Sequence, residues 1–65
     1  MLMLFILNGF FSIGNVDLIE ESVALVEYKT DDGFVHKNVR INKNICIPKE
    51  GQRVAFNDKE IISCL

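Results

Sequence analysis

The sequence has little of what enzyme active sites and metal centres need. It holds one histidine, two cysteines, one proline and no tryptophan among its 65 residues. The motifs G-x-S-x-G, H-E-x-x-H, G-x-G-x-x-G and the P-loop are all missing. Only His36 could act as a base at neutral pH, and it lies among polar residues on the predicted outer face of a strand. We therefore expect no enzymatic activity, no cofactor and no metal site.

The two cysteines, Cys46 and Cys64, have no metal-ligand spacing. A secretory signal needs a basic segment and a small-residue cleavage site, and the sequence shows neither. We expect two buried free thiols and a cytoplasmic location, because reducing compartments keep thiols unpaired. The alternative is a disulfide that ties the carboxy-terminal strand to the middle of the chain.

Charge is scarce at the amino terminus and unevenly placed elsewhere. The net charge is −2, and no charged residue occurs before Asp17. Acidic residues dominate positions 17–32 and basic residues dominate positions 33–59. We expect acidic and basic strands to lie side by side, so that their charges neutralise each other. The alternative is single-stranded nucleic-acid binding by the basic, asparagine-rich stretch 36–44, with exposed aromatic rings stacking on bases. The candidate contacts are His36, Lys37, Arg40 and Lys43, with Tyr28, Phe34 and Phe56 as stacking rings.

The first residues form the longest apolar run of the sequence. Met1–Leu7 is unbroken hydrocarbon, but a transmembrane helix needs about 20 apolar residues and Asn8-Gly9 interrupts this run. The pattern predicts a buried strand, a tight turn and a second strand over 10–16, with an apolar helical turn as the local alternative. A strand that is apolar on both faces needs a cover on each, either inside a small barrel or from another subunit.

The stretch around Thr30-Asp31-Asp32-Gly33 predicts a β-hairpin, since two β-branched runs flank an Asp-Gly step. Its loop is predicted to be Asp32-Gly33 or four residues long. Either loop places Glu27 near His36 or Asn38 on the outer face. The predicted core face holds Ala24, Val26, Tyr28, Val35, Val39 and Ile41.

Shorter strands are predicted on both sides of this hairpin. Residues 15–21 indicate a strand end that bends into an acidic turn. Ile45–Ile47 is predicted to be a short strand, which Pro48 stops because proline lacks a ladder N–H. Arg53–Phe56 and Glu60–Leu65 are predicted to form a closing hairpin around Asn57-Asp58.

The spacing of these strands predicts the fold class. Strand signals recur about every 8–12 residues without a helical pattern, which favours one all-β domain over residues 1–65. We expect a small five- to six-stranded antiparallel barrel or a compact sandwich. The early apolar strand, the Asp32-Gly33 hairpin and the Gly51-x-x-Val54 strand start resemble small oligonucleotide-binding or SH3-like barrels.

A second resemblance concerns the amino terminus. Met1-Leu2-Met3-Leu4 with Ile13-Gly14 is superficially similar to the carbon storage regulators, which are dimeric RNA-binding β proteins. No basic residues follow that opening here, and no carboxy-terminal helix pattern is present. Neither family is therefore assigned.

These observations favour a non-enzymatic interaction or regulatory module that associates with itself and binds another macromolecule. An edge strand that accepts a partner strand is one concrete mode. A third possibility is attachment of residues 1–11 to a membrane surface. The candidate protein interface comprises Phe5, Phe10, Phe11 and Phe34.

Overall fold

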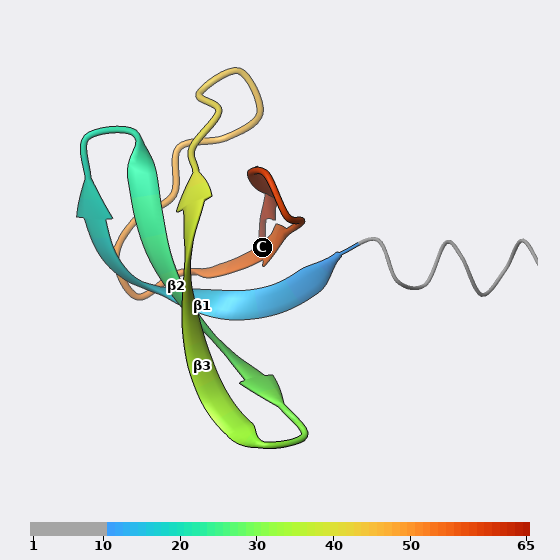
Figure 1. The fold of residues 1–65 in the computed structure, drawn as a ribbon. Helices are drawn as coiled ribbons and strands as arrows, with labels where there is room; N and C mark the ends of the chain where they lie inside the picture. Colours follow the sequence, from blue (N-terminus) through green and yellow to red (C-terminus); the bar gives the residue numbers. More distant parts are fainter. Residues whose placement is uncertain (1–10) are drawn as a thin grey trace, which may run out of the picture.

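The computed structural model describes residues 11–65, which form one sheet of five antiparallel strands. The strand order is β3-β2-β1-β4-β5, and Figure 1 shows that the sheet is twisted, so the all-β prediction is confirmed. The predictions for Met1–Leu7, Asn8-Gly9, Phe5 and Phe10 lie outside the described residues. The strands are β1 (Ser12–Glu20), β2 (Val23–Thr30), β3 (Gly33–Arg40), β4 (Arg53–Phe56) and β5 (Ile61–Cys64).

Strand β1 lies at the centre and pairs with β2 on one side and β4 on the other. It runs to Glu20, so the predicted acidic turn over 15–21 is wrong. A register shift between Val16 and Leu18 leaves Asp17 unpaired, which is a β-bulge. The bulge resets the side-chain alternation, so Ile19 packs on the core while Leu18 is exposed. The turn comes only afterwards, at Glu21-Ser22.

The predicted β2–β3 hairpin is confirmed, with Thr30 paired to Gly33. The loop is therefore Asp31-Asp32 rather than Asp32-Gly33. The Thr30 hydroxyl accepts a hydrogen bond from the Asp32 N–H and donates one to the Gly33 carbonyl. The Gly33 φ of 117° explains why glycine follows the aspartates. Glu27 lies directly opposite His36, as the predicted faces require.

The core lies on the face of the sheet that the hairpin prediction identified. Of the predicted core residues, Val35 is only partly buried and Tyr28 packs against the core from its margin. Gly14 brings β1 close to β2, because a Cβ there would lie 2.5 Å from the Glu27 carbonyl oxygen. The buried cluster is Val16, Ala24, Val26, Val39, Ile41, Val54, Phe56 and Ile61.

The segment 41–52 connects β3 to β4 without regular strand structure, so the predicted strand at Ile45–Ile47 is wrong. Its local turn explains this, because the N–H groups of Ile45 and Cys46 both donate to the Asn42 carbonyl. The segment then follows β1, where the Glu50 carboxylate accepts a hydrogen bond from the Ile19 N–H. The predicted closing hairpin is confirmed as β4 and β5.

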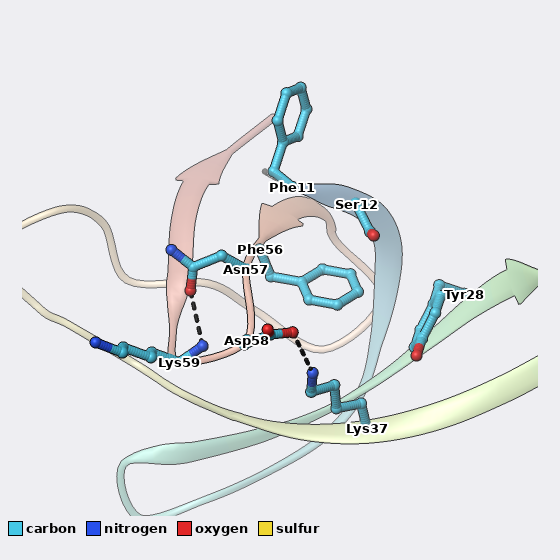
Figure 2. Close-up of a pocket in the computed structure, with 8 residues that line it drawn as sticks. All are labelled: Phe11, Ser12, Tyr28, Lys37, Phe56, Asn57, Asp58 and Lys59. Atoms are coloured by element: carbon cyan, nitrogen blue, oxygen red, sulfur yellow. Dashed lines mark hydrogen bonds and ion pairs between the residues drawn. The ribbon is translucent and has the colours of Figure 1, made fainter. Parts of the chain in front are cut away.

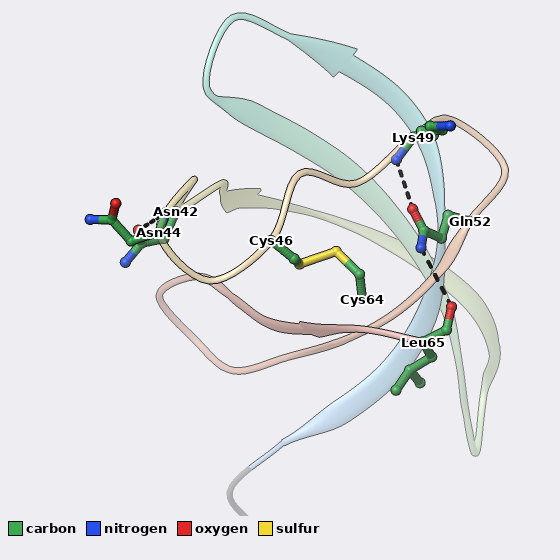
Figure 3. The surroundings of a disulfide bond; sticks show 7 residues. All are labelled: Asn42, Asn44, Cys46, Lys49, Gln52, Cys64 and Leu65. Carbon is green, nitrogen blue, oxygen red and sulfur yellow. Dashed lines mark hydrogen bonds between the residues drawn. A yellow bond between two sulfur atoms is a disulfide. The ribbon is translucent and has the colours of Figure 1, made fainter.

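Cys46 and Cys64 form a disulfide that joins this irregular segment to β5 (Figure 3). The expectation of two free thiols is therefore wrong. Their Cα atoms lie 6.1 Å apart, within the range that a disulfide spans. Both cysteines pack against the hydrophobic core. The disulfide attaches the irregular part of this segment to β5, and it removes one argument for a reducing compartment.

The sheet is not closed into a barrel. Beyond the five-strand order, one isolated parallel bridge between Arg40 and Glu60 connects the end of β3 to the start of β5. The Arg40 N–H donates to the Lys59 carbonyl there, at 3.2 Å. Within residues 11–65, no helix is long and apolar enough to cross a membrane.

Replacing Gly14 with alanine should destabilise the fold by roughly 1–3 kcal/mol, the usual cost of overpacking. The added methyl group would meet backbone at the Glu27 carbonyl, which a side-chain rotation cannot relieve. Urea unfolding measures the loss. Ser12→Thr is the control, since it also adds one carbon to β1 at an exposed position. Equal midpoints for both variants would contradict the close approach of β1 and β2.

Removing the disulfide should lower the free energy of unfolding by about 3 kcal/mol, because the bond closes a loop across a sequence separation of 18. The double variant Cys46→Ser with Cys64→Ser and the reduced wild type should show the same loss in urea unfolding. The double variant supplies its own control, because reductant should leave its midpoint unchanged. A wild type insensitive to reductant would contradict a stabilising disulfide.

Candidate functional site

A half-open pocket of about 600 Å³ lies between the start of β1, the β2–β3 hairpin and the β4–β5 turn. Figure 2 shows side chains from these elements around it, with the Phe11 ring and the Lys59 side chain directed away from the Phe56 and Tyr28 rings. Its surface is divided between aromatic rings and polar groups. The lining residues are Phe11, Ser12, Tyr28, Lys37, Phe56, Asn57, Asp58 and Lys59.

The aromatic side of the pocket is built from the core outwards. Phe56 is buried at the end of β4, and its ring meets the Tyr28 ring edge-on, with centroids 5.1 Å apart and planes at 66°. This edge-to-face geometry is the favoured one for aromatic pairs. Phe11 stands at the mouth of the pocket with 49% of its surface exposed (Figure 2). A side chain bound in the pocket would therefore contact the packed rings of Tyr28 and Phe56 and the half-exposed ring of Phe11.

The polar side of the pocket is organised by the β4–β5 turn. The side-chain amide oxygen of Asn57 accepts hydrogen bonds from the backbone N–H groups of Lys59 and Glu60, each at 2.8 Å. Asp58 projects from this turn, and its Oδ1 lies 3.0 Å from the Lys37 Nζ. The Asp58 side chain is almost fully exposed, so this ion pair contributes little to stability. Its effect is to neutralise Lys37.

The basic candidates for nucleic-acid contact do not share one surface. His36 and Lys37 are adjacent on β3 and so point to opposite faces of the sheet. Each has an acidic partner, Asp17 for His36 and Asp58 for Lys37. Arg40 ends β3 beside Lys59 and Glu60, and Lys43 is exposed in the following turn. Alternation along β3 could have revealed the split between His36 and Lys37 in the sequence.

The aromatic candidates divide in the same way. Tyr28 and Phe56, both predicted as stacking rings, come together in the pocket. Phe34 does not join them, because it lies at the tip of the β2–β3 hairpin on the opposite face and is 68% exposed. Phe11, predicted for a protein interface, joins the pocket instead. Sequence reasoning missed Asn57 and Asp58 as pocket residues, since their turn pattern indicated only a connection.

A second group of polar side chains lies on the outer face of the sheet. The His36 Nε2 and Asp17 Oδ2 atoms are 2.9 Å apart, and a Glu27 carboxylate oxygen lies within 4.8 Å of both. The hairpin prediction placed Glu27 near His36 or Asn38, and the structure pairs it with His36. The approach of Asp17 to His36 was not predicted, because it depends on the pairing of β1 with β2.

The pocket offers chemistry suited to binding. Its rings supply apolar contact, and its amide and ammonium groups supply hydrogen bonds at the rim. The Ser12 hydroxyl, a potential nucleophile, has no hydrogen bond to a histidine or carboxylate among residues 11–65. Comparisons of the chain with protein-family models, curated proteins and solved structures found no significant match.

Proposed function

We propose that the protein is a non-enzymatic binding module that takes an extended segment of a partner protein. An apolar side chain of that segment enters the pocket between Phe11, Tyr28 and Phe56. The observation that carries the proposal is the combination of fixed aromatic walls with one half-exposed ring at the mouth. Buried aromatic anchors of this kind supply most of the affinity in protein recognition.

The charge around the pocket favours a peptide over a nucleic acid. The Asp58 carboxylate lies 3.0 Å from the Lys37 Nζ, so it would repel a phosphate that approached this lysine. Among residues 11–65, Lys59 is the remaining lysine of the pocket and has no acidic partner within ion-pairing distance. A carboxylate or a backbone carbonyl of a partner segment accepts a hydrogen bond from the Lys59 ammonium group. The net charge of −2 adds no general attraction for phosphates.

Self-association at the amino terminus is part of the same proposal. The sequence has no charge before Asp17, and both Phe11 and Ile13 leave 49% of their surface exposed. Apolar surface of this kind is costly in water unless a second chain covers it. A barrel-like shape of the oligonucleotide-binding or SH3 type also remains a proposal, supported by the Arg40–Glu60 bridge.

The pocket can be tested with peptides selected from a random displayed library on the immobilised wild-type protein. We expect the selected peptides to carry an aromatic or large aliphatic anchor. Phe11→Ala should weaken their binding about tenfold or more, because the anchor loses an apolar wall. Phe34→Ala is the matched control and should leave the dissociation constant within about twofold, since Phe34 is exposed but remote from the pocket. Isothermal titration calorimetry measures both.

Two outcomes would overturn the peptide proposal. The first is selected peptides whose affinity does not change in Phe11→Ala. The second is binding of a single-stranded oligonucleotide that weakens steeply with added salt and is lost when Lys37, Arg40 and Lys43 are all changed to alanine. That result would establish the nucleic-acid alternative instead.

Sedimentation equilibrium should show dimers or larger species of the wild-type chain at micromolar concentration. Leu4→Ser with Ile6→Ser should shift the equilibrium towards monomer, because it puts two hydroxyl groups into the apolar run. Ile47→Ser is the control, since Ile47 is exposed and lies far along the chain. A wild type that remains strictly monomeric would exclude self-association.

A further inference from the structure

The outer face of the sheet brings one donor atom from each of three adjacent strands to a single place. Asp17 comes from the bulge of β1, Glu27 from the middle strand β2, and His36 from β3. All three donor atoms lie within 4.8 Å of one another. We propose that Asp17, Glu27 and His36 bind a divalent transition-metal ion.

The backbone fixes the approach of these side chains. Glu27 and His36 are directly opposed in the β2–β3 ladder, so their side chains rise on the same face. Val16 points into the core, so the next residue, Asp17, points to the outer face, where its side chain reaches across β2 to His36. Asp17 is also the unpaired residue of the β-bulge, and bulges are enriched beside functional sites.

The donor spacing suits a metal ion of the first transition row. Metal–ligand distances of about 2.0–2.2 Å place neighbouring donors about 3 Å apart. The Asp17 Oδ2 and His36 Nε2 atoms form a hydrogen bond at 2.9 Å, and a metal ion that took both atoms as ligands would replace the proton between them. The Glu27 side chain is only partly buried and can rotate to complete the set. One imidazole with two carboxylates suits Zn²⁺ or Mn²⁺ and leaves further positions to water or to a partner's ligand.

The charge around the three residues is also suitable. Within residues 11–65, no lysine or arginine lies within ion-pairing distance of Asp17 or Glu27. Apart from the contact between Asp17 and His36, their negative charge has no ion-pair partner in this part of the chain. On the same face, Lys29 follows Glu27 along β2, and Arg53 lies opposite Asn15 at the β1–β4 pair. Neither Lys29 nor Arg53 forms an ion pair with the three donors.

The disulfide makes the test specific. Because Cys46 and Cys64 are paired, neither thiol competes for the metal in the oxidised protein. Isothermal titration of the full oxidised chain with Zn²⁺ should show one site per chain. Mn²⁺ should broaden the amide signals of residues near Asp17, Glu27 and His36 in heteronuclear spectra before it broadens others.

Asp17→Asn, Glu27→Gln and His36→Asn should each weaken Zn²⁺ binding about tenfold or more. Asp31→Asn is the matched control, since it removes a carboxylate at the hairpin tip and should change affinity less than about twofold. The spectra show directly whether each variant remains folded. An adventitious ion only is the contrary outcome, seen as Mn²⁺ broadening spread over all carboxylates or as equal Zn²⁺ affinities in every variant.

Discussion

Both sides of β1 are occupied by hydrogen-bonded partners, and the rest of the structure depends on this. The β2–β3 hairpin and the β4–β5 hairpin do not pair with each other as strands, so β1 holds them in one sheet. Its first half needs Gly14 to approach β2 closely, and its second half needs the bulge at Asp17. The same strand thus determines where the pocket opens and where the outer polar group forms.

The elements that the sequence predicted well are the ones with local signals. The β2–β3 hairpin has a turn signature and alternating faces, and the register between Glu27 and His36 follows from them. The length of β1 could not be predicted, because a bulge breaks the alternation on which strand recognition depends. Ile45–Ile47 has strand composition, but its backbone hydrogen bonds go to Asn42 and a disulfide holds the segment.

The candidate site was predictable only in part, and the reason is its dependence on long-range contacts. Tyr28 and Phe56 could be identified as aromatic candidates, but their meeting requires β1 to separate their strands by a fixed distance. Lys37 was grouped with the basic stretch, whereas its position in the alternation sends it to the pocket and to Asp58. Pairing of Cys46 with Cys64 likewise depends on distances that composition does not contain.

The position of Lys37 on β3 also affects the exposed edge of the sheet. Strand β3 is the longer of the two edge strands within residues 11–65, and an eight-residue edge is a template for the addition of further strands. An inward-facing lysine near the middle of such a strand penalises stacking and fibril growth, because a second sheet would have to bury its ammonium group. The salt bridge to Asp58 keeps this charge at the sheet margin. We expect the side chain that lines the pocket also to oppose the addition of further strands at this edge of the sheet.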